Sequence, residues 1–244
     1  MRIHCLQHLA TEGSGLVADW AAQRGHTLTV TPWFEPEPPL PPAAELDLLV
    51  VLGGPMSVHD QATFPWLRTE KAYLRTALAA GTPTLGLCLG SQLLAEALGA
   101  KVGRNAEPEV GFWPVQFTPA AQQLPLLRHA PAEWTALHWH FDAFTLPPGA
   151  VALASSAATA CQGFAYEGRV VGLQFHPEAN DELLDVLVAA EGATLPAGRY
   201  VQPLAALQAR RPALAHGAKL LFPLLDALLA VPTCDLPRAA ALRS

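Results

Sequence analysis

A cysteine at position 88 stands between two glycines, in the segment Gly86-Leu-Cys-Leu-Gly90. The apolar run before it predicts a buried strand, and residues 91–98 predict a helix that ends at Gly99. A residue on such a sharp turn is typical of a nucleophile elbow, which exposes a reactive side chain at a helix N-terminus. The helix dipole there favours a thiolate over a thiol. The pattern therefore predicts that Cys88 is a nucleophile.

A cysteine nucleophile needs a general base, and the base needs a group that orients it. The best candidates lie in the segment Gly172-Leu-Gln-Phe-His-Pro-Glu178. The predicted strand over residues 169–175 delivers His176 at its end, and Glu178 follows closely enough to hold the imidazole in one tautomer. Taken alone, the same letters fit an ordinary surface turn. Combined with the Cys88 elbow, they favour a catalytic base with its orienting carboxylate.

The elements that must position these residues alternate between strands and helices. Strands are expected over residues 2–7, 27–31 and 47–52, and helices over residues 13–24 and 64–80. This order predicts an α/β fold with a doubly wound, mostly parallel central sheet that is flanked by helices. In such sheets the site lies at the carboxyl ends of the strands, where Gly53, Gly54 and Cys88 all fall.

The second half of the chain has a different pattern of predicted elements. Short strand candidates separated by turn residues predict an additional antiparallel region; they cover residues 110–118, 134–139, 150–155, 161–166 and 169–175. Helices are then expected over residues 181–190, 204–210 and 215–229. We predict one domain over residues 1–191 and a helical C-terminal extension over residues 192–244, packed on or beside it. The apolar stripe at residues 220–229 fits either a core or an interface, so a homodimer stays open.

The composition narrows the class of protein. The chain has 244 residues, of which 51% are apolar and 15% charged, so it can bury a sizeable core. A net charge of −6 without a basic stripe argues against a nucleic-acid partner. Neither a signal peptide nor an apolar run of the roughly 18 residues that a membrane span needs is visible, so we expect no membrane association. Four cysteines, far apart and without a C-x-x-C pair, argue against zinc and disulfides and fit a reducing, cytoplasmic location: Cys5, Cys88, Cys161 and Cys234.

Three motifs together resemble the class I glutamine amidotransferases. They are Gly53-Gly-Pro55, Gly86-Leu-Cys-Leu-Gly-Ser-Gln92 and Gly172-Leu-Gln-Phe-His-Pro-Glu178. The resemblance covers residues 47–191 well and implies a flavodoxin-like fold with a Cys-His-Glu triad and no cofactor. The triad would be Cys88, His176 and Glu178. It would hydrolyse the glutamine side-chain amide to glutamate and ammonia through a thioester intermediate.

The resemblance also assigns the groups around the triad. The backbone amides of Gly54 and Leu89 would form the oxyanion hole, and both a glycine pair and a helix N-terminus suit that task. Gly53 and Gln92 would contact the substrate, Gln92 at its amino-acid end. His140 and Asp142 would also bind substrate.

A narrower resemblance, to stand-alone GMP-synthase-like members, rests on residues 109–115, 138–142 and 161–164. Phe141 departs from it, because many relatives have glycine there.

Other histidines and cysteines receive structural interpretations. His138 and His140 fit a partly buried aromatic patch better than a metal site, so no metal is expected. Cys161 fits a buried structural thiol. Nothing in the sequence connects His4 or His8 to the site.

Three functional interpretations follow. The chain is a glutaminase-type subunit that works with a separate synthase, a hydrolase of γ-glutamyl peptides or amides with the same triad, or a non-catalytic regulatory or binding subunit. The intact set of Cys88, His176 and Glu178 disfavours the third. A glutamine amidotransferase-like hydrolase that acts on a small molecule is expected.

Overall fold

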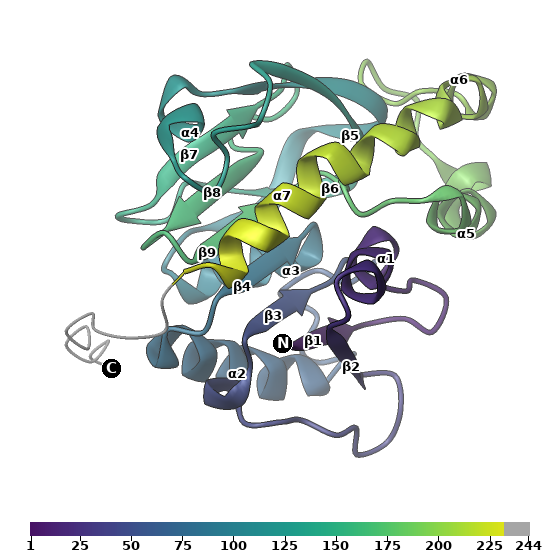
Figure 1. Ribbon diagram of the computed structural model, residues 1–244. Coiled ribbons are helices and arrows are strands. Elements are labelled where there is room, and N and C mark those ends of the chain that lie inside the picture. The colour runs from purple at the N-terminus through teal and green to yellow at the C-terminus, as the bar shows by residue number, and fades with distance from the viewer. Residues whose placement is uncertain (232–244) are drawn as a thin grey trace.

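Nine strands form one mixed sheet in the computed structural model, which describes residues 1–231 (Figure 1). Their order is β2-β1-β3-β4-β9-β8-β7-β5-β6; the first five run parallel and the remaining pairs are antiparallel. The predicted α/β fold with an added antiparallel region is therefore confirmed. The strands are β1 (Arg2–Gln7), β2 (Thr27–Pro32), β3 (Leu48–Val51), β4 (Thr84–Leu87), β5 (Val102–Phe117), β6 (Glu133–Phe144), β7 (Val151–Ser155), β8 (Gly163–Tyr166) and β9 (Val170–Leu173).

The helices follow the predicted order with shifted ends. They are α1 (Leu16–Gln23), α2 (Trp66–Ala80), α3 (Leu89–Ala97), α4 (Pro119–Gln123), α5 (Asp181–Glu191), α6 (Leu204–Arg210) and α7 (Gly217–Leu229), with short 3₁₀ turns η1 (Ala43–Glu45), η2 (Gly192–Thr194) and η3 (Arg211–His216). Helix α2 begins after Phe64 because a residue that precedes a proline disfavours helical backbone. The predicted helix over residues 215–229 begins instead as the last turn of η3.

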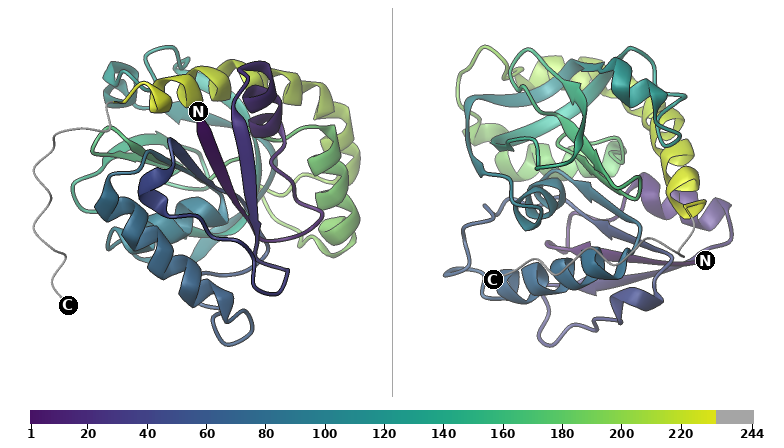
Figure 2. Two further views of the ribbon diagram at one scale, coloured as in Figure 1. Left: turned by 60° about the horizontal axis from the view of Figure 1, so that its bottom comes forward. Right: turned by 90° about the vertical axis from the view of Figure 1, so that its left-hand side faces the viewer.

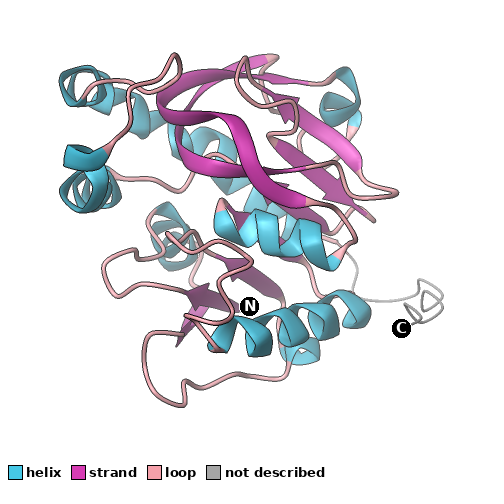
Figure 3. Cartoon of the chain, turned by 180° about the vertical axis from the view of Figure 1, so that it is seen from behind, coloured by secondary structure: helices cyan, strands magenta, loops and turns pink. Residues whose placement is uncertain are grey.

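The parallel part of the sheet is covered on both faces. In β3, Leu48 and Val50 point into a core shared with α1 and α7, whereas Leu49 and Val51 point into a core shared with α2 and α3. This alternation follows the two-residue repeat of a strand, and apolar residues on both faces are what a buried parallel strand requires. In the left view of Figure 2, α1 and α7 lie on one side of the parallel strands and α2 lies on the other, and Figure 3 shows the molecule from behind.

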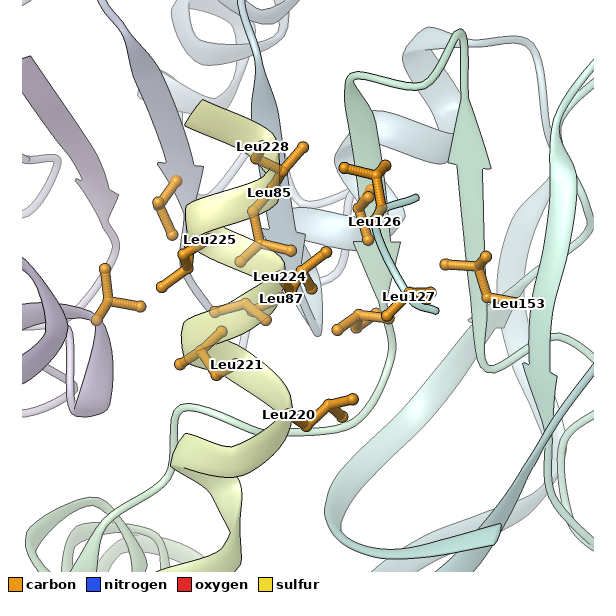
Figure 4. Packing of buried hydrophobic residues seen from close by; sticks show 14 of the residues in the cluster. Leu85, Leu87, Leu126, Leu127, Leu153, Leu220, Leu221, Leu224, Leu225 and Leu228 are labelled. Atoms are coloured by element: carbon orange, nitrogen blue, oxygen red, sulfur yellow. The ribbon is translucent and has the colours of Figure 1, made fainter. Parts of the chain in front are cut away.

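Helix α7 packs its leucines against the sheet and not against solvent (Figure 4). The helical stretch Leu204–Leu229 is long and apolar enough to cross a membrane, a test that core helices also pass. Asp226 of α7 accepts hydrogen bonds from Trp20 and Arg24, which attaches the helix to α1. The buried leucines, which belong to the same cluster as β1, β3 and β4, are Leu220, Leu221, Leu224, Leu225 and Leu228. The remainder of the predicted extension, with Cys234, lies outside the described residues.

Strands β5 and β6 form an antiparallel arm that is longer than predicted. The polar residues at the start of β5 gave no strand pattern, but they pair with the end of β6 across a register shift between Arg104 and Glu109. Helices α5 and α6 pack on this arm around a third apolar cluster. The arm brings His140 and Asp142 of β6 close to the carboxyl ends of the parallel strands.

Candidate active site

Cys88 lies on a tight turn between β4 and α3. Its backbone has φ 49° and ψ −107°, a conformation that is unusual for a residue other than glycine. The flanking glycines permit the turn: a Cβ atom on Gly86 would lie 2.6 Å from the Gly90 carbonyl, and one on Gly90 would lie 2.1 Å from the Val51 oxygen. The structure therefore has the elbow geometry that the sequence predicts, with the thiol at the N-terminus of α3.

His176 follows β9 and is held by a carboxylate. Its Nδ1 donates to Glu178 Oε1 over 2.7 Å, and its Nε2 has no hydrogen-bond partner among residues 1–231. Burial alone would lower the pKa of His176, but the carboxylate of Glu178 and the neighbouring Cys88 raise it well above its usual value. A Cβ atom on Gly53 would approach both His176 Cε1, at 3.3 Å, and Cys88 Cβ, at 3.7 Å. The imidazole and the thiol therefore meet across Gly53.

One cavity of about 300 Å³ opens onto both groups. Five of the residues that the sequence nominates for the triad, oxyanion hole or substrate line it directly, besides Cys88: Gly54, Gln92, His140, Asp142 and His176. Gly53, Leu89 and Glu178 do not line the cavity. Each is next to a residue that does: Gly53 and Leu89 to Cys88, and Glu178 to His176. The structure thus brings every nominated residue to one place.

The backbone around the thiol has free donors. Within residues 1–231, neither the Gly54 nor the Leu89 N–H makes a hydrogen bond. Leu89 is the first residue of α3, where N–H groups lack a partner in their own helix. These two N–H groups are therefore available to an anionic oxygen near Cys88, and the oxyanion hole stays a prediction.

A pair of glutamine side chains reaches from the cavity wall to the sulfur. Gln92 Nε2 donates to Gln174 Oε1 over 3.2 Å and to the Asp142 carbonyl over 3.3 Å. Gln174 Nε2 in turn donates to Cys88 Sγ over 3.6 Å. Gln174 lies two residues before His176 and was not predicted to belong to the site. Gln174 therefore links the Gln92 side chain to the thiol.

Carboxylates also line the cavity and were not predicted. Glu12 follows β1, and Glu191 ends α5 and accepts a 2.8 Å hydrogen bond from Trp139 Nε1. Burial raises the pKa of Glu12, and the nearby His176 partly offsets this rise. Across the cavity, Arg104 lies 3.8 Å from Asp142. Acidic and basic side chains therefore both line the cavity.

The expectation that nothing connects His8 to the site is wrong. His8 is buried, its Nδ1 lies 2.8 Å from the Gly53 carbonyl and its Nε2 lies 2.9 Å from Glu70 Oε1. Its ring stacks on Trp66. Burial alone would lower the pKa of His8, but Glu70 raises it above the usual value, so both nitrogens can donate. Because β1 ends beside β3, His8 reaches the Gly53-Gly54 loop and supports it through the contact with the Gly53 carbonyl.

Replacing His8 with leucine should destabilise the protein by about 3–5 kcal/mol, because Glu70 would become an unpaired buried charge. The loop that carries Gly54 would also lose its support, so reaction of the Cys88 thiol with an electrophile should slow. Urea unfolding measures the first effect. The double variant His8→Leu/Glu70→Leu is the matched control and should be more stable than His8→Leu alone, because it buries no charge. Equal stabilities would show that Glu70 is not an unpaired buried charge in His8→Leu and would contradict this prediction.

The remaining candidates behave as structural residues. His4 forms hydrogen bonds with the hydroxyl groups of Thr29 and Thr31, and His59 is exposed. Cys161 is buried, and burial raises the pKa of its thiol; burial raises the pKa of Cys5 to about 12. Neither thiol has the environment of a nucleophile.

An α/β fold with a cysteine elbow, a carboxylate-held histidine and backbone N–H groups beside the thiol has the parts that acyl transfer through a cysteine requires. The chain belongs to the class I glutamine amidotransferase family, whose model matches residues 14–190. It is 34% identical to the glutamine amidotransferase-like protein YfeJ of Salmonella typhimurium, over 86% of this chain and 90% of that protein.

A solved structure and a GMP synthase component extend the comparison. A glutamine amidotransferase from Thermotoga maritima superposes with a TM-score of 0.82 at 29% identity, covering 94% of this chain and 98% of that one. One of the GMP synthase subunits of Ignicoccus hospitalis, described as glutamine-hydrolysing, is 31% identical over 63% of this chain and 77% of that protein. The family predicted from the three motifs is confirmed.

Proposed function

We propose that this protein hydrolyses the side-chain amide of glutamine through a thioester on Cys88. The observation that carries the proposal is that His176 lines the same cavity as Cys88, with its Nδ1 bound to Glu178 and its Nε2 without a hydrogen-bond partner within residues 1–231. A histidine held in this way has one nitrogen committed to the carboxylate and one available for proton transfer.

The proposed reaction has two halves. Cys88 attacks the amide carbon, and the oxygen that becomes negative is stabilised by the N–H groups of Gly54 and Leu89. The proton held at His176 Nε2 goes to the leaving nitrogen, so ammonia departs and the thioester remains. His176 then takes a proton from water, hydroxide attacks the thioester carbon, and glutamate leaves with the thiolate restored. Gln92 and Asp142 would hold the amino-acid end.

The ammonia is proposed to pass to a separate synthase. The Ignicoccus hospitalis relative is named as one component of a GMP synthase, and its match spans 77% of that protein. By contrast, the match to the Aeropyrum pernix GMP synthase spans only 31% of that longer protein.

A second candidate is hydrolysis of γ-glutamyl amides with larger leaving groups. Glu12 and Glu191 line the cavity beside the triad, and a leaving amine with its own positive charge would be recognised by carboxylates that ammonia does not need.

A substrate panel separates the two candidates. Glutamine, γ-glutamyl dipeptides and γ-glutamyl amides of cationic amines are each incubated with the protein, while ammonia, free amine and glutamate are measured. Equal release of ammonia and glutamate from glutamine, at a rate above that for every γ-glutamyl amide, is expected for a glutaminase. Faster release of amine from the γ-glutamyl compounds would replace the first candidate with the second, and turnover of neither class would contradict both.

A further inference from the structure

Three buried side chains beside the cavity leave a group of polar atoms without partners. Glu109, His138 and His140 are at most 2% exposed. Within residues 1–231, four of their atoms make no hydrogen bond: Glu109 Oε1, His138 Nδ1, His138 Nε2 and His140 Nε2. Buried polar atoms are nearly always paired, so four together indicate that something else belongs between them.

The unpartnered atoms converge. Glu109 Oε2 lies 3.2 Å from His140 Nε2, and Glu109 Oε1 lies 3.8 Å from His138 Nδ1. The three ligand atoms that one ion would use lie within 4.8 Å of one another. Two ligands of one tetrahedral zinc ion are roughly 3.3–3.5 Å apart, given metal–ligand distances of about 2.0–2.2 Å. Small rotations of the side chains would therefore suffice to surround an ion.

The surroundings hold these ligands in the form that a metal requires. His140 Nδ1 lies 3.0 Å from the Asp142 carbonyl, so it carries the proton and leaves Nε2 with a lone pair. Glu109 Oε2 accepts hydrogen bonds from Thr159 Oγ1, at 2.9 Å, and Gln162 Nε2, at 2.7 Å. Hydrogen bonds of this kind to the ligands orient them at known metal sites.

We propose that Glu109, His138 and His140 bind one divalent transition-metal ion, with zinc as the expected ion. Two imidazoles and a carboxylate are a donor set that such ions take, with a further position open to water. A proton shared between Glu109 and His140 would satisfy one contact and leave His138 unpartnered, whereas an ion satisfies three of the four orphaned atoms at once. This proposal replaces the sequence-based expectation of a simple aromatic patch.

The ion would join two strands of the antiparallel arm at the cavity. Glu109 in β5 pairs directly with His140 in β6, and Gly111 pairs with His138. Thr159 and Gln162 attach the loop before β8 to the same point. Because His140 also lines the cavity, an ion here would stiffen that wall. The expected role is therefore structural, and it does not depend on the proposed reaction.

The test uses the full chain with Cys88→Ala, so that the thiol and His176 cannot capture the ion. After treatment with a chelator, Zn²⁺ is titrated by calorimetry and Co²⁺ by visible absorption. One ion per chain is expected, with a cobalt spectrum of nitrogen and oxygen ligands, no sulfur charge-transfer band, and a higher unfolding midpoint. Failure to bind an ion, or a sulfur band, would overturn the proposal and leave water or a proton as the occupant.

Three further variants in the same background locate the ion. His138→Asn should lose binding, and Thr159→Val should weaken it by about 10–100-fold because a hydrogen bond to Glu109 is removed. His59→Gln, at an exposed histidine, is the matched control and should bind as before. If His138→Asn does not fold, Thr159→Val decides. Unchanged affinity in Thr159→Val, or in a folded His138→Asn, would place the ion elsewhere and overturn the assignment.

Discussion

Replacement of Cys88 with alanine is expected to reduce glutamine hydrolysis by on the order of 10⁴–10⁶-fold in kcat, because Cys88 is the thiol that lines the cavity with His176 in the described part of the chain. Release of glutamate and ammonia, followed with purified protein, measures the loss. Cys5 and Cys161 are buried in the core and cannot substitute for Cys88. Residual hydrolysis near the wild-type rate would contradict the proposed mechanism.

The backbone at Cys88 supplies a matched control. At φ 49° and ψ −107°, the backbone of a residue that has a side chain is strained by about 1–3 kcal/mol, whereas glycine adopts this conformation freely. Cys88→Gly should therefore be as inactive as Cys88→Ala but more stable than it, as urea unfolding would measure. Equal stability of the two variants would show that the elbow is not strained. In the wild type, a glutamine-analogue electrophile should label Cys88, and labelling of Cys161 instead would contradict the assignment.

The residues of the triad could be predicted because each lies in a short motif that can be recognised from neighbouring positions in the sequence. Cys88 is marked by glycines two positions away, and Glu178 lies two residues from the histidine that it orients. The order of strands and helices then placed both motifs at the carboxyl ends of strands in one parallel sheet. The substrate roles of Gln92, His140 and Asp142 rested on resemblance, and the structure brings these residues to the cavity without testing the roles.

The residues that were missed act through contacts between distant parts of the chain. His8 is separated from Glu70 by 62 positions, and only the pairing of β1 with β3 brings its ring beneath Gly53. Glu109 meets His140 because the β5–β6 pair passes through a register shift that no sequence pattern indicates. The apolar face of α7 was visible in the sequence, but its partner was not, because the helix packs on strands some 130–220 residues earlier.

Replacement of Glu178 with glutamine is the second change with a large expected effect. In the wild type, burial alone would lower the pKa of His176, but Glu178 and Cys88 raise it well above its usual value, so the Glu178 carboxylate favours the imidazolium. The amide in Glu178→Gln still fills the space but carries no charge, and it can leave the ring in the wrong tautomer. By analogy with triads in which the orienting carboxylate is removed, kcat should fall by on the order of 10²–10⁴-fold. Alkylation of Cys88 by iodoacetamide at pH 7 should slow as well.

The same substitution changes how stability depends on pH, and the sign follows from the raised pKa of His176. Its imidazolium is stabilised in the folded state, so this contribution is complete below the unfolded pKa of about 6.5 and is lost as the pH rises through the higher folded value. The free energy of unfolding of the wild type should therefore decrease over that interval, and Glu178→Gln should show a smaller decrease. Urea unfolding from pH 6 upward measures both slopes. Glu182→Gln, at an exposed position in the first turn of α5, is the matched control and should keep both the wild-type slope and the wild-type kcat. Equal slopes in all three proteins would show that Glu178 does not hold the proton on His176.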